Sequence, residues 1–200
     1  MSRNFAVLGK TPVESSKDSL DVQPAAHPGE YTELIQRLFC GSSVVAIIGA
    51  GSGEGVAGVC EGIASELSRL GRRVVLVSVQ RLLPMNPITL PDETAFMPGS
   101  ARNVWLWPSP AGQQIEFFKP RLPAGGENWL DSLRRNFDSV LLDCPDVEAA
   151  PLGVAIAARA DAAVLAVEAE RTPKNQILRD QRALELSGVK LAGCILIDAR

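Results

Sequence analysis

The segment Gly49–Gly55 is the part of the sequence whose residue types could do chemistry, because it holds four glycines in seven residues. It follows the apolar run Val44–Ile48, which is typical of a buried strand, and it precedes apolar residues at helical spacing. A glycine-rich turn between a strand and a helix exposes backbone N–H groups at the positive end of the helix dipole, an arrangement that binds phosphate. The candidate phosphate- or anion-binding residues are therefore Gly51, Ser52, Gly53, Glu54 and Gly55.

A dinucleotide-binding loop is one interpretation of this segment. The fingerprint Gly-x-Gly-x-x-Gly is met by Gly53, Gly55 and Gly58, but the match begins four residues after the apolar run ends. The next predicted strand leads to Gln80, where such sites carry a carboxylate for the ribose. The match to a dinucleotide site is therefore incomplete.

A triphosphate-binding loop is the second interpretation, and it requires Gly-Lys-Ser/Thr at the start of the helix. Here Gly55 is followed by Val56 and Ala57, so the lysine that neutralises the phosphates and the hydroxyl that holds Mg²⁺ are both absent. Each charge-assisted hydrogen bond lost from a phosphate site removes roughly 1.5 to 3 kcal/mol. Two such losses predict nucleotide binding weaker by on the order of 10² to 10⁴. The loop is then either a residual anion site or a tight turn that the fold requires.

The composition argues against several other functions. The 200 residues include 20 basic and 23 acidic side chains, a formal net charge of −3, so no broad basic surface for nucleic acid is expected. The four cysteines stand far apart and are interpreted as buried thiols of a cytoplasmic protein, without a zinc or disulfide pattern. The single histidine, His27, leaves little for histidine-based catalysis or metal binding. No apolar run approaches the roughly eighteen residues needed to cross a bilayer, so we expect no membrane insertion. Because the cysteines stand far apart and there is one histidine, we also expect no metal site.

Strand and helix patterns alternate through most of the chain. Strands are predicted over residues 44–48, 73–79, 103–107, 139–142, 162–167 and 191–197, and helices over residues 30–40, 56–70, 126–135 and 173–186. This alternation predicts an α/β fold in which a doubly wound, mostly parallel sheet forms a single domain over residues 29–200. Residues 1–28 lack periodicity and predict an extended or partly ordered N-terminal arm. The proline-rich residues 82–126 predict surface loops at one edge of the sheet.

Three segments of the chain resemble one protein family, the third being the strand and turn of residues 160–167 and 172–173. Residues 44–80 resemble the first strand–helix–strand unit of the bacterial tyrosine autokinases of polysaccharide export, within the wider group of partition and septum-site ATPases. The family's loop reads Pro-Gly-Glu-Gly-Lys-Ser-Thr, and Gly71 lies at the family's interval from Gly55. Residues 136–145, Asn-Phe-Asp-Ser-Val-Leu-Leu-Asp-Cys-Pro, resemble the Walker B segment Tyr-Asp-x-Val-Ile-Ile-Asp-Thr-Pro-Pro. The resemblance extends over residues 30–197 and implies a P-loop NTPase-like fold.

The same resemblance identifies chemical residues that this chain replaces. Val56 and Ala57 stand in place of the loop's lysine and hydroxyl, and Ser78 and Gln80 stand in place of an Asp-x-Asp motif at the end of the second strand. Of the family's acidic residues only Asp143 remains, as a Walker B remnant. Its alternative interpretation is structural, as a side chain that caps or hydrogen-bonds the loop after its strand. We therefore expect no catalytic residue and read the nucleotide site as degenerate.

Two recognition features of the family are missing as well. The asparagine that reads adenine after the last strand is replaced, since the chain reads Ile197-Asp198 there. The family's C-terminal tyrosine cluster has no counterpart before Arg200, and the chain has one tyrosine, Tyr31. Self-phosphorylation of the family's kind is therefore not expected.

These replacements predict a non-catalytic, autokinase-like pseudo-ATPase. By resemblance it would be a cytoplasmic module that regulates or scaffolds exopolysaccharide or envelope polysaccharide machinery. Its partner would be a membrane chain-length regulator or a catalytically intact kinase paralogue, and any membrane association would come through that partner. No cofactor is expected. The open alternative is a weak ATP-binding protein or kinase that uses the loop amides and Asp143 with ATP or ADP and Mg²⁺.

The helix predicted to begin at residue 30 resembles the segment through which family members contact one another. Its candidate interface residues are Glu30, Tyr31 and Arg37, and a homo-oligomer is an open prediction.

Two further groups of side chains have a purely structural interpretation. Trp105 and Trp107 share one face of a predicted strand, and together with Trp129 they mark either the core or a partner surface. The charged side chains of the last predicted helix are read as a solvated face: Arg179, Asp180, Arg182 and Glu185.

Overall fold

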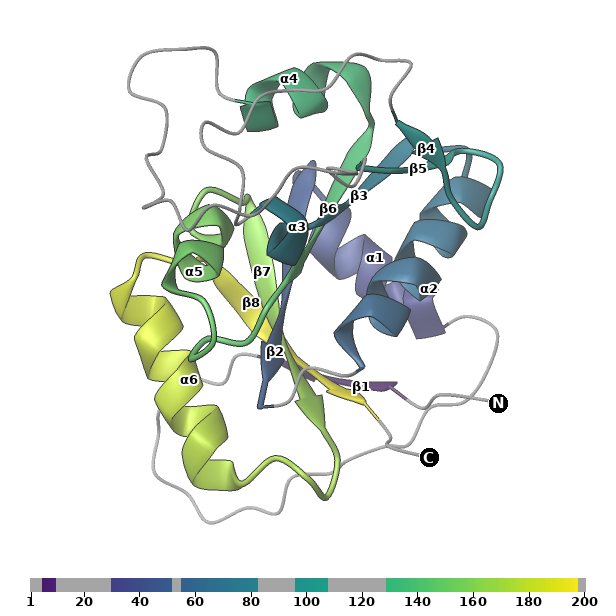
Figure 1. Ribbon diagram of the computed structural model, residues 1–200. Helices are drawn as coiled ribbons and strands as arrows, with labels where there is room; N and C mark the ends of the chain where they lie inside the picture. The colour runs from purple at the N-terminus through teal and green to yellow at the C-terminus, as the bar shows by residue number, and fades with distance from the viewer. Residues whose placement is uncertain (1–4, 10–29, 52–54, 83–95, 108–128, 198–200) are drawn as a thin grey trace.

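A computed structural model of the chain describes residues 5–9, 30–51, 55–82, 96–107 and 129–197. The strands are β1 (Phe5–Gly9), β2 (Val44–Ala50), β3 (Val74–Ser78), β4 (Met97–Pro98), β5 (Val104–Leu106), β6 (Ser139–Cys144), β7 (Ala162–Glu168) and β8 (Leu191–Ile197). The helices are α1 (Glu30–Phe39), α2 (Val56–Arg69), α3 (Val79–Leu82), α4 (Trp129–Asn136), α5 (Pro151–Ala157) and α6 (Lys174–Leu186). Figure 1 shows the helices flanking a twisted central sheet.

The described residues form one eight-stranded sheet with the order β1-β8-β7-β2-β6-β3-β5-β4. Strand β2 lies at its centre and pairs in parallel with β6 on one side and β7 on the other. The two edge strands, β1 and β4, are antiparallel to their neighbours. The predicted α/β fold with a mostly parallel sheet is confirmed.

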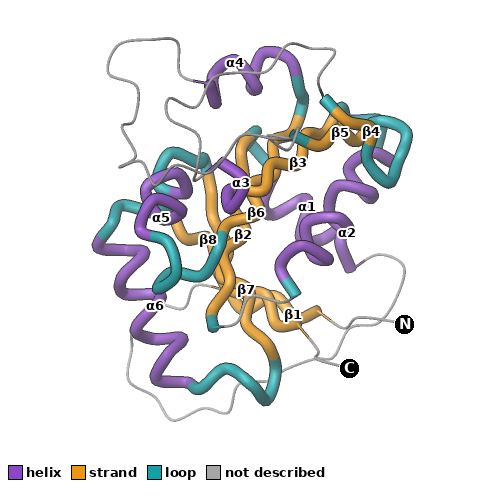
Figure 2. Tube along the Cα trace, in the orientation of Figure 1, coloured by secondary structure: helices purple, strands orange, loops and turns teal. Residues whose placement is uncertain are grey.

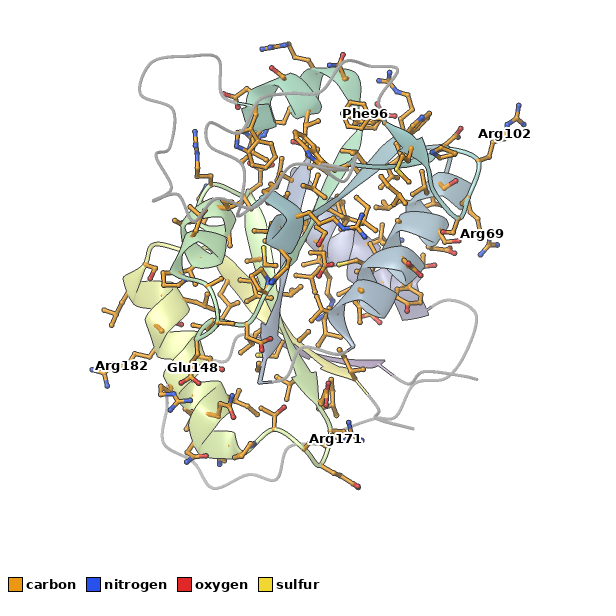
Figure 3. The ribbon with its side chains drawn as sticks, viewed as in Figure 1. Arg69, Phe96, Arg102, Glu148, Arg171 and Arg182 are labelled. Carbon is orange, nitrogen blue, oxygen red and sulfur yellow. The ribbon has the colours of Figure 1, made fainter. Side chains whose placement is uncertain are left out.

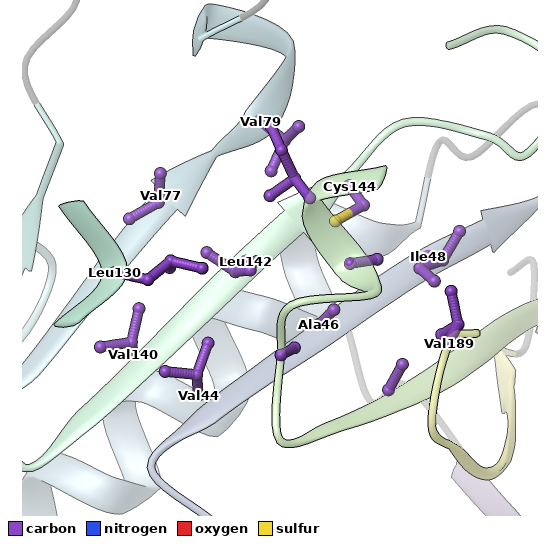
Figure 4. Close-up of a cluster of buried hydrophobic side chains, with 14 of the residues drawn as sticks. Val44, Ala46, Ile48, Val77, Val79, Leu130, Val140, Leu142, Cys144 and Val189 are labelled. Atoms are coloured by element: carbon purple, nitrogen blue, oxygen red, sulfur yellow. The ribbon is translucent and has the colours of Figure 1, made fainter. Parts of the chain in front are cut away.

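Helices cover both faces of the sheet, as Figure 2 shows by element type. Side chains of β2 alternate between the faces, because successive residues of a strand point in opposite directions. Val45 and Ile47 pack with α1 and α2, while Val44, Ala46 and Ile48 pack with α3, α4, α5 and α6. Figure 4 shows part of this second cluster, where Val79 of α3 lies close to the end of β6. Every residue of β2 is buried, which explains its continuous apolar run.

Several elements differ from the sequence prediction. The arm predicted over residues 1–28 contributes the edge strand β1, which its pattern did not indicate. Helices α3 and α5 and the two-residue strand β4 were not predicted either. Much of the proline-rich region lies outside the described residues, and its described part forms β4 and β5 at the sheet edge. The prediction of four buried thiols is confirmed for Cys60 and Cys144, but Cys194 is half-buried and Cys40 is exposed.

The amino-terminal ends of the strands are held together by Asp161, which lies just before β7. Its Oδ2 accepts hydrogen bonds from the backbone N–H groups of Ser43 and Val44, each at 2.9 Å. Its Oδ1 accepts one from Arg134 Nη2 of α4 at 2.8 Å. Burial raises the pKa of Asp161, but the backbone hydrogen bonds and the charge of Arg134 outweigh burial, so that the pKa lies below its ordinary value. This carboxylate therefore joins β2, β7 and α4 at the amino-terminal ends of the strands, whereas the glycine loop lies at their carboxyl ends.

Candidate functional site

The glycine loop leaves the carboxyl end of β2, where parallel α/β sheets place their ligands. Gly51 follows β2 with φ of +92°, a left-handed conformation that residues other than glycine rarely adopt. Gly55 precedes α2 as its N-terminal cap, and no side chain caps the helix there. Ser52, Gly53 and Glu54, three of the five predicted anion-binding residues, lie outside the described residues. The structure thus describes the two ends of the predicted cradle.

The first end of the loop is tied to the turn that follows β7. Thr172 Oγ1 donates a hydrogen bond to the backbone carbonyl of Ala50 at 3.2 Å. A Cβ atom built on Gly51 would lie 3.5 Å from Nε2 of Gln176 in α6 and 3.8 Å from Thr172 Oγ1. The side-chain amide of Gln176 is therefore a hydrogen-bond donor beside the loop, and the sequence interpretation missed it.

The second end of the loop is packed against the last strand. A Cβ atom built on Gly55 would lie 2.9 Å from Cδ1 and 3.0 Å from Cγ2 of Ile197, which is buried. A real Cβ atom almost never comes this close to another carbon atom, so Ile197 would have to shift, and packing favours glycine at position 55. This observation favours the interpretation of the loop as a turn that the fold requires.

Val56 and Ala57 occupy the positions at which the family that the sequence resembles has a lysine and a hydroxyl for phosphate binding, and both side chains are apolar. Val56 is 3% exposed and packs in the core between α2 and the sheet. Ala57 is exposed and carries only a methyl group. The start of α2 therefore presents neither a cation nor a hydroxyl to the loop.

Asp143, the predicted Walker B remnant, lies near the end of β6. It is in register with Ile47 of β2 and Ser78 of β3, so it lies next to the strand that leads into the loop. Burial raises the pKa of Asp143, the positive charge of Arg81 opposes this effect, and the negative charge of Glu61 adds to it. In the described part of the chain no hydrogen bond or ion pair is formed by the Asp143 carboxyl.

Helix α3 follows β3 without an intervening loop, at the place of the family's Asp-x-Asp motif. Ser78 is half-buried, and Gln80 and Arg81 are exposed. Arg81 therefore supplies a positive charge near Asp143 where the resembling family has carboxylates. The sequence interpretation missed Arg81, because its approach to Asp143 depends on α3 beginning directly after β3. Among the described residues no group of three metal-ligating side chains is found.

The candidate interface residues lie on or beside α1. Tyr31 is half-buried, and its ring lies where a Cβ atom on Gly62 of α2 would be, so it fills a space between the two helices. Arg37 is exposed and pairs with Glu33 at 2.6 Å. Glu30 begins α1. A role of these residues in contacts between subunits stays a prediction.

The three tryptophans were interpreted as either core residues or a partner surface. Trp107 and Trp129 are buried and pack edge to face with ring centroids 5.6 Å apart, which confirms their interpretation as core residues. Trp105 is partly buried against Phe137, with ring centroids 5.7 Å apart.

The prediction that the charged side chains of α6 form a solvated face is wrong for Asp180, which is 2% exposed.

Comparison with solved structures identifies the fold. The chain is similar to the BceF tyrosine kinase domain, with a TM-score of 0.62 and 18% identity over 84% of this chain and 74% of that one. It is similar to the VpsO kinase domain, with a TM-score of 0.63 and 14% identity over 84% of this chain and 91% of that one. The chain has the fold of these kinase domains. It is also similar to the cell division protein MinD of Aquifex aeolicus, with a TM-score of 0.55 and 19% identity over 78% of this chain and 69% of that one.

These neighbours, two tyrosine kinase domains and a MinD cell division protein, are of the kinds that the sequence resembles, and the expected P-loop NTPase-like fold is confirmed. By sequence, no family model and no curated protein matches the chain. The described residues include no helix long and apolar enough to span a membrane.

Proposed function

We propose that this protein is a non-catalytic, autokinase-like module, a pseudo-ATPase that regulates or scaffolds exopolysaccharide or envelope polysaccharide machinery. The observation that carries the proposal is the burial of Val56 in the core at the position of the phosphate-binding lysine. Phosphoryl transfer depends almost wholly on positioning and charge neutralisation. Val56 and Ala57 at the start of the helix supply neither a positive charge for the phosphates nor a hydroxyl for Mg²⁺.

The charges near the loop support the same proposal. Asp143 and Glu61 are both acidic, and Arg81 is the basic residue that offsets them. A triphosphate without Mg²⁺ would be repelled by the two carboxylates, and the hydroxyl that would help to hold Mg²⁺ is replaced by the methyl group of Ala57. The site therefore disfavours the nucleotide and lacks the hydroxyl that would help to hold its metal.

The partner proposed for the module is a membrane chain-length regulator or a catalytically intact kinase paralogue. The module would act in the cytoplasm and reach the membrane through that partner. Glu30, Tyr31 and Arg37 at the start of the domain are the proposed contact residues, and they would also serve in a homo-oligomer. The kinase-domain fold of the neighbours supports this assignment.

A second candidate is a protein that still binds ATP or ADP with Mg²⁺. The left-handed Gly51 and the neighbouring amide of Gln176 favour it, because both are compatible with an anion at the loop. One relative by fold, a cobyrinic acid a,c-diamide synthase from Mycobacterium smegmatis, was solved with bound ADP and magnesium, at a TM-score of 0.50 and 20% identity over 76% of this chain and 72% of that one.

Thermal unfolding with and without nucleotide separates the two candidates. A ligand present at about one hundred times its dissociation constant adds roughly 2.7 kcal/mol to the free energy of unfolding. The pseudo-ATPase proposal predicts no shift of Tm with millimolar ATP or ADP, with or without Mg²⁺, and no transfer of labelled phosphate to any protein. A Tm increase with ATP and Mg²⁺ that disappears in Asp143→Asn would refute it and support the second candidate.

A further inference from the structure

The outer surface of α6 carries an unusual pattern of exposed side chains. Lys174, Leu178, Arg182 and Leu186 follow one another at intervals of four residues, and all four are exposed. Leu178 is 56% exposed and Leu186 is 81% exposed. Residues four apart on a helix lie on the same side. We call these four residues the α6 stripe.

The α6 stripe is the outer side of a helix whose inner side is firmly packed. Leu184 is fully buried against the sheet, and Asp180 is 2% exposed. Ile177 packs against the same core. The exposed leucines therefore do not result from a loosely attached helix, and no described element covers them.

The cations of the α6 stripe lack acidic partners within the described residues. Arg179, which lies beside the stripe, is paired with Glu148 at 2.5 Å. Glu185 accepts a hydrogen bond at 3.2 Å from the neutral amide of Gln181 and so keeps its negative charge beside the stripe. Lys174 and Arg182, in contrast, form no ion pair in the described part of the chain. Figure 3 shows Arg182 extending outward from α6. The four residues of the stripe thus carry two positive charges and no negative charge, on a chain whose formal net charge is −3.

We propose that the α6 stripe is a docking surface for an acidic helical segment of a partner protein, with leucines that contact Leu178 and Leu186. Charge complementarity selects an acidic partner, since Lys174 and Arg182 alternate with the leucines. The two leucines are separated by about 12 Å along the helix, from the rise of 1.5 Å per residue, so a second helix with apolar residues eight apart matches them. This proposal does not depend on whether the glycine loop binds nucleotide.

An anionic membrane is a poorer match to the same residues. Each basic residue near an anionic lipid surface contributes about 1 kcal/mol, and the stripe has two of them. Two leucines on one helix bury little area in a lipid interface, whereas stable anchoring takes stronger or additional signals. The surface is suited to a small, reversible protein contact.

The test uses a fluorescein-labelled helical peptide of Glu, Ala and Leu, with leucines eight residues apart and glutamates between them. Fluorescence anisotropy with the full-length protein gives its Kd. The paired variant Leu178→Glu and Leu186→Glu, and the paired variant Lys174→Glu and Arg182→Glu, should each raise the Kd by about tenfold or more. All four positions are exposed, so these variants should keep the wild-type Tm within a few degrees.

Leu70 provides a matched control, since it is 57% exposed just beyond α2. Leu70→Glu should leave the Kd unchanged. A peptide with lysines in place of the glutamates should bind at least about tenfold more weakly. The proposal is overturned if the acidic peptide does not bind, or if Leu70→Glu weakens binding as much as the α6 variants. It is also overturned if anionic phosphatidylserine vesicles bind through α6 while the peptide does not, or if the stripe only joins two copies of this chain.

Discussion

Substituting Gly55 by alanine tests whether packing, rather than phosphate, explains the glycine at the end of the loop. The added methyl group would lie 2.9 Å from Cδ1 and 3.0 Å from Cγ2 of Ile197. Cδ1 is the flexible end of the isoleucine side chain, but Cγ2 branches from Cβ and cannot move away independently. Ile197 is 4% exposed, so its whole side chain has little free space into which to turn.

The expected cost combines an overpacking effect with backbone effects. Overpacking a core position costs roughly 1–3 kcal/mol. Gly55 has φ of −88° and ψ of −16°, which alanine also adopts, so the loss of chain entropy in the unfolded state favours alanine by about 0.4–1 kcal/mol. Alanine is, however, a poorer helix N-cap than glycine, and the two backbone effects roughly offset each other. We therefore expect Gly55→Ala to lower the free energy of unfolding by about 1–3 kcal/mol.

A double-mutant cycle with Ile197 isolates the overpacking effect. Ile197→Ala removes both methyl groups at a cost of its own of about 2–5 kcal/mol, and in that background Gly55→Ala should change stability by less than about 0.5 kcal/mol. Ile197→Val removes only Cδ1 and should give an intermediate result. Urea unfolding followed by tryptophan fluorescence measures each free energy. Equal costs of Gly55→Ala in the wild-type and Ile197→Ala backgrounds would refute the packing argument.

Three other substitutions test the rest of the structure. Asp161→Asn should lower the free energy of unfolding by roughly 2 kcal/mol at pH 7, because it weakens charge-assisted hydrogen bonds. The pKa of Asp161 is lowered in the folded state, so the difference between the variant and wild type in urea unfolding should vanish as the pH falls through that pKa. Asp143→Asn should instead stabilise the protein at pH 7, because burial raises the pKa of this carboxyl and penalises its charge in the folded state. That gain should disappear below about pH 4, where the carboxyl is protonated in both states, and a loss of stability at pH 7 would contradict the interpretation. Gly62→Ala should lower Tm by overpacking Tyr31, and Tyr31→Ala should remove most of that additional effect in a double mutant.

The sheet was predictable from sequence because its central strands are continuous apolar runs buried on both faces. The β-branched apolar run over residues 44–48 predicted a buried strand, now seen as Val44–Ala50, and the glycine turn after it located the helix that follows. Helix α5 was missed because Pro151–Ala157 is apolar around much of its circumference and shows no helical periodicity. Strand β1 was missed because an edge strand of five residues depends on its pairing with β8 rather than on its own pattern.

The candidate site was predictable only in part. The sequence indicates that Val56 lacks a charge, but only the packing shows that its side chain belongs to the core. The charge of Arg81 near Asp143 depends on α3 following β3 without a loop, which no short-range pattern predicts. Asp180 looked like a surface residue because charged residues surround it, and the helix nevertheless turns it inward. In each case the tertiary contact decides the role of the residue.

Isothermal titration calorimetry of the full-length protein with ATP and Mg²⁺ tests the central claim, that a core valine at the lysine position leaves the loop unable to hold a triphosphate. We predict no saturable heat up to millimolar nucleotide. A saturable isotherm with a micromolar Kd that Asp143→Asn abolishes would contradict the claim and make this chain a nucleotide-binding protein.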